Sequence, residues 1–112
     1  RITMSVAQAE IDSAAFVLFY RAGCGYCTQA EKVLNQMSIE YKRVNAPDGS
    51  SMRKALLEKC GKTSVPQGFV HGVHVGGCND GAQAWMGIVP LARNGKLKAA
   101  INGKAQDALA TL

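Results

Sequence analysis

Two cysteines set between an apolar run and an amphipathic stretch constrain this chain more than any other feature. They form the motif Cys24-Gly-Tyr-Cys27. Residues 16–20 before the motif are continuously apolar, which is typical of a strand buried on both faces, and residues 25–37 after it carry apolar side chains at helical spacing. The sequence therefore predicts a strand that delivers two thiols to the first turn of a helix.

This position gives the two thiols different environments. A helix N-terminus has unpaired backbone N–H groups and the positive end of the helix dipole, and both favour a thiolate at Cys24. Arg21 adds positive charge nearby, and no acidic residue between positions 12 and 31 cancels it. Cys27 falls on the apolar stripe of the helix. We expect Cys24 at an exposed tip as the nucleophile, with Cys27 turned toward the core as the resolving thiol.

A zinc site is the main alternative for such a pair of cysteines. Zinc requires two further ligands, and Cys60, Cys78, His71 and His74 are the candidates. The sequence has no second CxxC or HxxxH pair, and zinc knuckles lie on loops and hairpins rather than between a strand and a helix. The context therefore favours a redox dithiol.

Composition limits the remaining classes of function. With 112 residues, 47% of them hydrophobic, the chain is expected to form one domain over 1–112 with a core that needs no disulfide or metal cross-links. Its four cysteines do not suggest a secreted disulfide scaffold. The net charge of +5 comes from scattered basic residues, which argues against nucleic-acid binding and suits a small anionic substrate. No apolar run is long enough to span a membrane.

The first residues carry no apolar core of a signal peptide. We therefore expect an intracellular protein, in the cytosol or in an organelle. A chain that begins at Arg1 also leaves open that a targeting segment has been removed upstream.

The rest of the chain alternates predicted helices and strands. Further helices are predicted over residues 5–13, 51–60 and 96–112, and further strands over 39–45, 69–71 and 73–75. The helix between the first two strands requires them to be parallel, and the last two form an antiparallel hairpin that turns at Gly72. We predict an α/β fold with a mixed four-stranded sheet flanked by helices.

A glycine-rich turn over residues 76–80 is predicted to lead into another helix. Asn79 or Asp80 is its expected N-cap. Pro90 is expected to open a further short helix at its first position, closed by Gly95.

Three motifs, in this order along the chain, resemble those of the glutaredoxins. The first is Arg21-x-x-Cys24-Gly-Tyr-Cys27, similar to a basic residue followed by a CPYC-type dithiol. The second is Ser64-Val-Pro66, similar to a Thr-Val-Pro segment in which the proline is cis. The third is Gly-Gly-Cys-Asn-Asp over residues 76–80. The resemblance runs from about Val6 to Ile101 and implies a thioredoxin-like fold.

The resemblance also implies a glutathione site between these motifs. Cys24 would hold the glutathione sulfur in a mixed disulfide. Val65, just before Pro66, would pair its backbone N–H and C=O with the cysteinyl part of glutathione, in the manner of an added strand. Tyr26 would line the cleft. Arg21 and Arg53 would pair with the glycyl carboxylate.

The γ-glutamyl end of glutathione would bind at the third motif. Backbone N–H groups at Cys78, Asn79 and Asp80 would take the γ-glutamyl carboxylate, and the Asp80 side chain is the candidate partner of the ammonium group. Plainer alternatives stay open. Asp80 as an N-cap, Arg53 as a solvated helix residue and Cys78 as a small core residue are also consistent with the sequence. The two histidines are expected to be exposed hairpin residues without a role.

The predicted activity is that of a dithiol glutaredoxin, a glutathione-dependent thiol–disulfide oxidoreductase. Its substrates would be protein–glutathione mixed disulfides and small disulfides, and its partners glutathione and glutathionylated or disulfide-containing proteins. Gly25 replaces the usual proline of the motif, and some relatives with glycine there resemble [2Fe–2S] binders. The alternative function is therefore a cluster-bridged homodimer, with Cys24 as the metal ligand and glutathione as co-ligand, in place of a monomer. Gly23, where relatives often have a larger residue, and Gly68, where an apolar strand residue is usual, are further departures.

Overall fold

A computed structural model describes residues 6–62, 64–80 and 87–103 of the chain. Nine elements occur in these ranges. They are α1 (Val6–Ile11), β1 (Phe16–Tyr20), α2 (Gly25–Gln36), β2 (Lys42–Asn45), α3 (Ser51–Cys60), β3 (Gln67–Val70), β4 (Val73–Gly76), α4 (Ile88–Arg93) and α5 (Lys96–Asn102).

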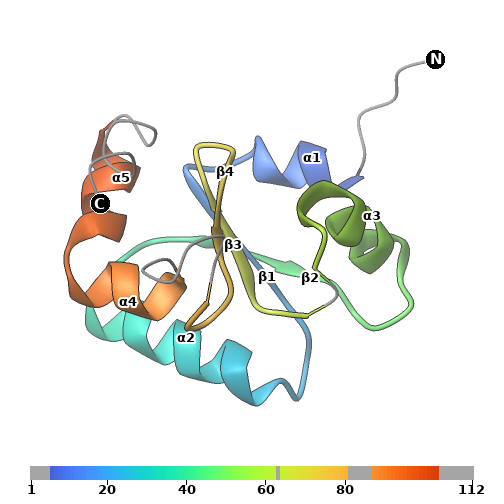
Figure 1. Cartoon of the computed structure of the whole chain (residues 1–112), viewed down its shortest axis with the longest axis horizontal. Helices are drawn as coiled ribbons and strands as arrows, with labels where there is room; N and C mark the ends of the chain where they lie inside the picture. The colour runs from blue at the N-terminus through green and yellow to red at the C-terminus, as the bar shows by residue number, and fades with distance from the viewer. Residues whose placement is uncertain (1–5, 63, 81–86, 104–112) are drawn as a thin grey trace.

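The strands form one sheet in the order β2-β1-β3-β4 (Figure 1). The pair β1 and β2 is parallel, while β3 runs antiparallel to both β1 and β4. The mixed four-stranded sheet and the directions of its strands are confirmed. The continuous apolar run of β1 is explained by its central position, because Phe16–Phe19 are buried on both faces of the sheet.

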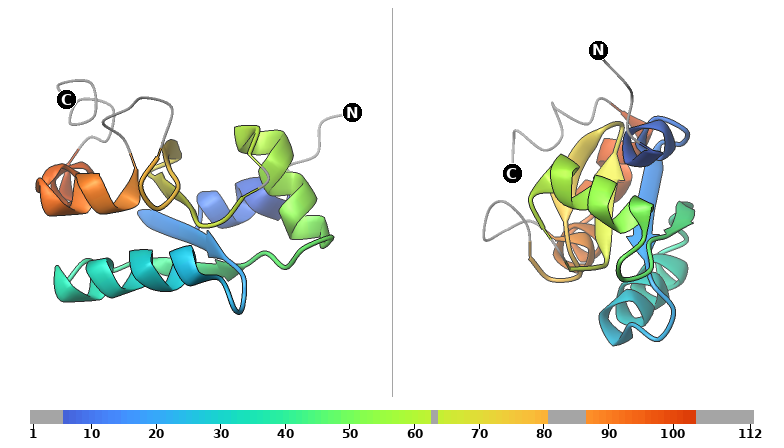
Figure 2. Two further views of the ribbon diagram at one scale, coloured as in Figure 1. Left: turned by 60° about the horizontal axis from the view of Figure 1, so that its bottom comes forward. Right: turned by 90° about the vertical axis from the view of Figure 1, so that its right-hand side faces the viewer.

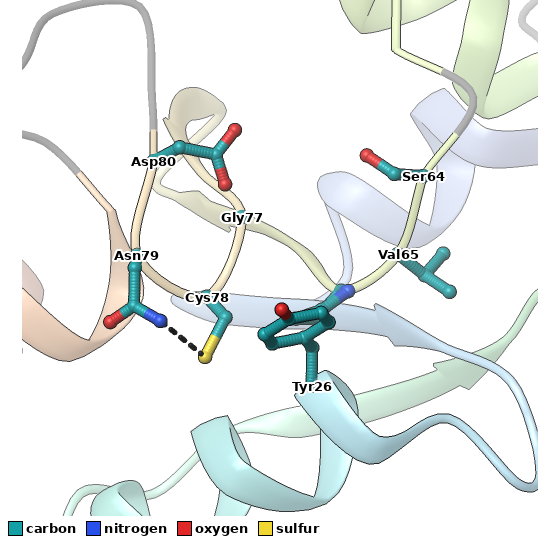
Figure 3. A pocket seen from close by; sticks show the side chains of 8 residues that line it. Tyr26, Ser64, Val65, Gly77, Cys78, Asn79 and Asp80 are labelled. Atoms are coloured by element: carbon teal, nitrogen blue, oxygen red, sulfur yellow. Dashed lines mark hydrogen bonds between the residues drawn. The ribbon is translucent and has the colours of Figure 1, made fainter.

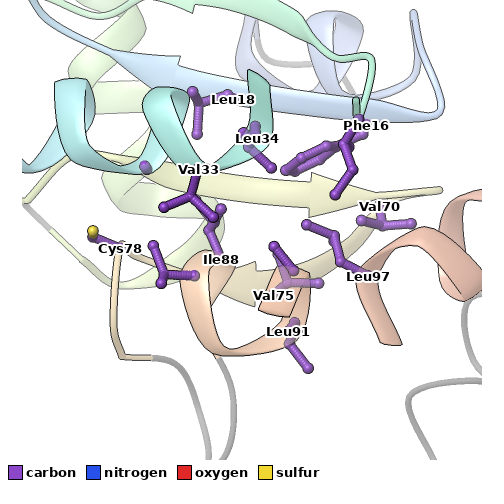
Figure 4. Packing of buried hydrophobic residues seen from close by; sticks show 14 of the residues in the cluster. Phe16, Leu18, Val33, Leu34, Val70, Val75, Cys78, Ile88, Leu91 and Leu97 are labelled. Carbon is purple, nitrogen blue, oxygen red and sulfur yellow. The ribbon is translucent and has the colours of Figure 1, made fainter. Parts of the chain in front are cut away.

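Helices cover both faces of the sheet, as the views in Figure 2 show. One core packs α2, α4 and α5 against Phe16 and Leu18 of β1 (Figure 4). The other core packs α1 and α3 against Val17 and Phe19. Alternate side chains of one strand therefore hold the two layers of helices together. None of the helices among the described residues is long and apolar enough to cross a membrane.

Gly68 of β3 has a packing reason. A Cβ atom at this position would lie 3.0 Å from Phe16 Cε1, 3.1 Å from Val75 Cγ2 and 3.2 Å from Ile88 Cδ1. The side chain of Ile88, at the start of α4, thus fills the space that an apolar strand residue would occupy. The missing side chain at Gly68 is therefore compensated by the Ile88 side chain of α4.

Several predicted boundaries differ from the structure. The first strand of the hairpin spans Gln67–Val70 in place of residues 69–71. The second strand begins at Lys42, because Ile39 still lies in the turn just after α2, where its N–H donates to the Leu34 carbonyl at 2.9 Å. Helix α4 begins at Ile88 rather than at Pro90, since a proline is tolerated throughout the first helical turn. Gly95 is expected to close the short helix that contains Pro90. In the structure it is the N-cap of α5, in the left-handed conformation with φ of 83°.

Other predictions fall on residues outside the described ranges. They are most of the helix expected after Asp80, the end of the helix expected over 96–112 and the first residue of the helix expected over 5–13.

Candidate active site

The two thiols of the motif lie at the start of α2, as predicted. Cys24 is the N-cap residue, with extended backbone, and its sulfur accepts a hydrogen bond from the Cys27 N–H at 3.2 Å. The Cys24 carbonyl accepts from both the backbone N–H and the hydroxyl of Thr28, each at 3.1 Å. The first turn of the helix therefore fixes Cys24 through both its side chain and its backbone.

The exposed tip predicted for Cys24 is wrong. Only 6% of Cys24 is exposed, compared with 2% of Cys27. The Cys24 thiol lies against the segment before Pro66 and donates to the carbonyl of Val65 at 3.5 Å. That carbonyl is 41 positions away along the chain, so the local pattern of the helix could not show that it covers the sulfur.

The Cys27 thiol has a pKa well above the ordinary range of a cysteine. Burial, helped by the hydrogen bond with Cys24, raises the pKa of Cys27 to about 12, while a backbone hydrogen bond with Arg21 acts in the opposite direction. Cys27 therefore remains a protonated thiol at neutral pH. This is the behaviour expected of a thiol that waits to resolve a disulfide rather than one that starts the attack.

A pocket of about 320 Å³ opens next to the Val65 segment that covers Cys24, and neither Cys24 nor Cys27 is among the residues that line it. Three segments meet there: the start of α2, the loop before β3 and the loop after β4 (Figure 3). The lining residues are Tyr26, Ser64, Val65, Pro66, Gly77, Cys78, Asn79 and Asp80. Tyr26 is 65% exposed and lies between the two loops. Six of the residues predicted for a glutathione site thus lie around one cavity. The Val65–Pro66 peptide bond is cis, as expected.

The loop after β4 is held in place by the start of α4. The N–H groups of Ile88 and Val89 donate to the carbonyls of Gly77 and Cys78, each at 2.8 Å. Within the loop, the Gly77 N–H donates to the Asp80 carbonyl at 2.6 Å. The N–H groups of Ile88 and Val89 are therefore bonded to this loop and are not available to a ligand. On this side of the pocket the lining is the loop itself and not the start of α4.

Cys78 is buried on the side of this loop that faces the core. Its sulfur accepts a long hydrogen bond from the Asn79 amide at 3.5 Å. Burial, followed by the charges of Asp80 and Cys24, raises the pKa of the Cys78 thiol. Burial also raises the pKa of Cys60, which is half-buried at the end of α3. Both thiols have the properties of packing residues.

The structure does not bring Arg21 and Arg53 into the lining of the pocket. Both contact Asp48: Arg53 Nη1 lies 2.8 Å and Arg21 Nε lies 4.0 Å from its carboxylate oxygens. Arg53 also donates from Nε to the Ala46 carbonyl at 3.0 Å. Arg21 stays close to the dithiol loop, since a Cβ atom at Gly23 would lie 3.9 Å from Arg21 Nη1.

The expectation that His74 is an exposed hairpin residue is wrong. Its ring is half-buried, and its Nε2 lies 2.7 Å from Oε1 of Gln67, the one polar side chain in the core of the described residues. Gln67 in turn donates to the Ser64 carbonyl at 3.1 Å. A glutamine directly after Pro66 in an otherwise apolar strand was the signal available in the sequence. His71 is exposed, as expected, with Nε2 2.8 Å from the Ile101 carbonyl.

A resident metal does not fit the described part of one chain. No three side chains of His, Cys, Asp or Glu within residues 6–62, 64–80 and 87–103 are arranged to hold a metal ion. A [2Fe–2S] cluster takes four protein or thiol ligands, and Cys24 is the cysteine of the dithiol motif whose sulfur contacts the Val65 carbonyl beside the pocket. One chain therefore does not supply a cluster site by itself.

A dithiol at a helix start, beside the backbone before a cis proline on a mixed sheet, defines a thiol–disulfide oxidoreductase of the thioredoxin-like fold. The glutaredoxin family model matches residues 16–75. The chain belongs to the glutaredoxin family.

Related sequences and solved structures support the assignment. A glutaredoxin of Vernicia fordii is 36% identical over 81 residues, which cover 70% of this chain and 78% of the relative. A glutaredoxin of Ricinus communis is 37% identical, over 70% of this chain and 79% of the relative. The structure of a buckwheat glutaredoxin–glutathione complex has a TM-score of 0.71 and 30% identity, covering 86% of this chain and 84% of the other. The holo form of glutaredoxin C1 from Populus tremula x tremuloides also gives 0.71, with 30% identity and coverage of 91% and 93%.

Proposed function

We propose that this chain reduces protein–glutathione mixed disulfides and small disulfides, with glutathione as the electron donor. The observation that carries the proposal is the 3.5 Å contact between the Cys24 sulfur and the Val65 carbonyl. It places the attacking atom against backbone that forms a wall of the pocket.

The reaction consists of two thiol–disulfide exchanges. The Cys24 thiolate attacks the glutathione sulfur of a mixed disulfide, which forms a Cys24–glutathione disulfide and releases the target thiolate, which then takes up a proton. A second glutathione thiolate attacks the glutathione sulfur bound to Cys24. This step releases oxidised glutathione and restores the Cys24 thiolate. Cys27 supplies the alternative route, in which it attacks the Cys24 sulfur, releases glutathione and forms the Cys24–Cys27 disulfide.

The pocket has the size and polar groups for the cysteinyl and γ-glutamyl parts of glutathione. Its volume of about 320 Å³ lies at the low end of the range for small-ligand sites. Val65 would pair its backbone with the cysteinyl unit. Because its carbonyl accepts from the Cys24 thiol in the free protein, ionisation of Cys24 would release that carbonyl for a substrate N–H. Tyr26 and Pro66 would supply apolar contacts along the same wall.

The opposite wall would bind the γ-glutamyl end. There the Asp80 carboxylate would face the ammonium group, and the backbone of Cys78 and Asn79 would face the carboxylate. Arg21 and Arg53 would take the glycyl carboxylate only in competition with Asp48, which holds both in the free protein.

Turnover of a glutathionylated peptide, coupled through glutathione reductase to the oxidation of NADPH, tests this function. Cys24→Ser should abolish turnover. Cys27→Ser should retain it, because a second glutathione can resolve the mixed disulfide. Wild-type protein without turnover would contradict the proposal, and loss of activity in Cys27→Ser would show that the dithiol route is obligatory.

A [2Fe–2S] carrier is the second candidate, favoured by the free space at Gly25. A Cβ atom at this position would meet no heavy atom within 4 Å, so the dithiol loop leaves room for a second subunit to approach. The cluster would need Cys24 from two chains and two glutathione thiols. Reconstitution with iron, sulfide and glutathione, followed by absorbance and size measurements, tests it. Protein that stays colourless and monomeric would exclude this function.

We also propose that the protein acts in the cytosol or in an organelle. Related glutaredoxins include one of rat named as mitochondrial and one of rice named as chloroplastic, with 34% and 30% identity. Both names agree with the expected location in the cytosol or in an organelle.

A further inference from the structure

A buried polar pair lies directly behind the wall of the pocket that Ser64, Val65 and Pro66 form. Gln67, 1% exposed, is the polar side chain of the pair on β3, and His74 is its partner on β4. A buried amide is tolerated only where hydrogen bonds replace those it made to water. Apolar packing therefore does not account for a glutamine at position 67, and its hydrogen bonds have to.

The hydrogen bonds fix the direction of the pair. The Gln67 amide nitrogen donates to the Ser64 carbonyl at 3.1 Å and lies 3.3 Å from the Ser64 hydroxyl. The Gln67 oxygen remains to accept from His74 at 2.7 Å. Because a carbonyl oxygen only accepts, Nε2 of His74 must carry the hydrogen.

The surroundings of His74 hold its ring in place. His74 lies opposite Phe69 across the hairpin, with ring centroids 4.9 Å apart. Burial lowers the pKa of His74, with Lys62 acting in the same direction and Asp80 against it. The ring is therefore neutral at neutral pH and serves as a fixed donor to Gln67.

The bond to the Ser64 carbonyl has a consequence for Val65. The Ser64 carbonyl and the Val65 N–H belong to one planar trans peptide unit, and the two groups of such a unit point in opposite directions. A donor that holds the Ser64 carbonyl from behind thus turns the Val65 N–H away from Gln67. The same peptide unit begins the wall of the pocket.

We infer that Gln67 and His74 are positioning residues that aim the Val65 N–H at the peptide backbone of a bound glutathionyl group. The inference rests on the proposed function, since it assigns a role in binding that substrate. It predicts that the pair matters for disulfides that carry a peptide backbone and not for those that lack one.

Rapid-mixing rates of attack by the reduced protein on two disulfides test this inference. One is a glutathionylated peptide, and the other is 5,5′-dithiobis(2-nitrobenzoate), which has no peptide group. His74→Phe should slow the reaction with the glutathionylated peptide about tenfold, equal to ~1.4 kcal/mol, and leave the aromatic disulfide unaffected. His74→Gln, which keeps a donor, should restore the rate.

His71 offers a matched control on the same hairpin, because its ring binds the Ile101 carbonyl, away from the pocket. His71→Phe should change neither rate. Gln67→Met breaks the pair from the other side and serves as the second variant if His74→Phe does not fold.

The outcomes separate the inference from the function on which it rests. Equal slowing with both disulfides, no slowing in either variant, or no rescue by His74→Gln would overturn the inference while the function stands. Wild-type protein that reacts with the aromatic disulfide but not with the glutathionylated peptide would overturn the proposed function, and the inference with it.

Discussion

The Cys27 N–H donates to the Cys24 sulfur at 3.2 Å, so one helical turn joins the two thiols while it places them in different environments. The donor lies at the sulfur that contacts the Val65 carbonyl. The residue that provides the donor keeps its own thiol in the core. This asymmetry is a property of the helix start.

Alkylation should distinguish the two thiols at neutral pH. Because burial raises the pKa of Cys27 to about 12, its reactive thiolate form is scarce there. We expect iodoacetamide to modify Cys24 and leave Cys27 unmodified, as measured by mass spectrometry of peptides after a short reaction. Modification of Cys27 before Cys24 would reverse their assigned roles.

Cys27 should also make the protein less stable at alkaline pH. Its pKa rises from 9.0 to about 12 on folding, so the native state holds a proton that the unfolded state loses between these values. The contribution to the free energy of unfolding is therefore present below about pH 9 and is lost as the pH rises toward 12. Chemical denaturation over this range should show a steeper loss for the wild type than for Cys27→Ala. Parallel curves would contradict the prediction.

Tyr41 provides an internal comparison for that experiment. Burial and its hydrogen bond to Glu31 raise the pKa of Tyr41 to about 12 as well. Its contribution remains in Cys27→Ala, so a residual alkaline slope is expected in that variant. Tyr41→Phe in the Cys27→Ala background should reduce this slope further, and the raised pKa values of Cys60 and Cys78 account for the part that is left.

Residue patterns within single segments predict several helices and strands of the fold. The buried run of β1, the helix that starts at the dithiol and the hairpin of β3 and β4 all follow from residue periodicity within single segments. The features that could not be predicted join distant segments. Val65 covers Cys24 from a loop far along the chain, and His74 finds its partner across a hairpin. Residue periodicity describes the faces of one element and carries no information about such pairs.

The arginines show a different limit. The sequence indicates positive charge near the dithiol. It does not indicate that Asp48 is the partner of both arginines, because an aspartate is a common residue in a turn and needs no partner there. The start of α4 was misplaced because proline is compatible with several positions in the first turn.

Gly77→Ala should weaken both the pocket and the fold. A Cβ atom there would lie 2.7 Å from Asp80 Oδ1 and 3.2 Å from the Pro66 carbonyl, so the Asp80 side chain would have to turn and the loop would have to shift away from Pro66. We expect a loss of about 1–3 kcal/mol in the free energy of unfolding and a higher KM for the glutathionylated peptide. Gly25→Ala is the control, because its Cβ atom meets nothing within 4 Å. Unchanged stability in Gly77→Ala would show that the loop accommodates the methyl group.

Asp48→Asn should lower the KM for a glutathionylated peptide. The Asp48 carboxylate, 75% exposed, contacts Arg53 and Arg21, so its removal takes away a competitor of the substrate carboxylate at both guanidinium groups. Exposed ion pairs contribute about 0.2–1 kcal/mol, which limits the expected decrease to a few fold. The gain should fade at high ionic strength, because salt screens exposed charges. Asp12→Asn removes the same charge beside Gln8 on α1, where Asp12 accepts a hydrogen bond at 2.9 Å, and should leave the KM unchanged. An unchanged KM in Asp48→Asn would mean that these arginines do not bind the substrate carboxylate and serve to anchor the turn before α3.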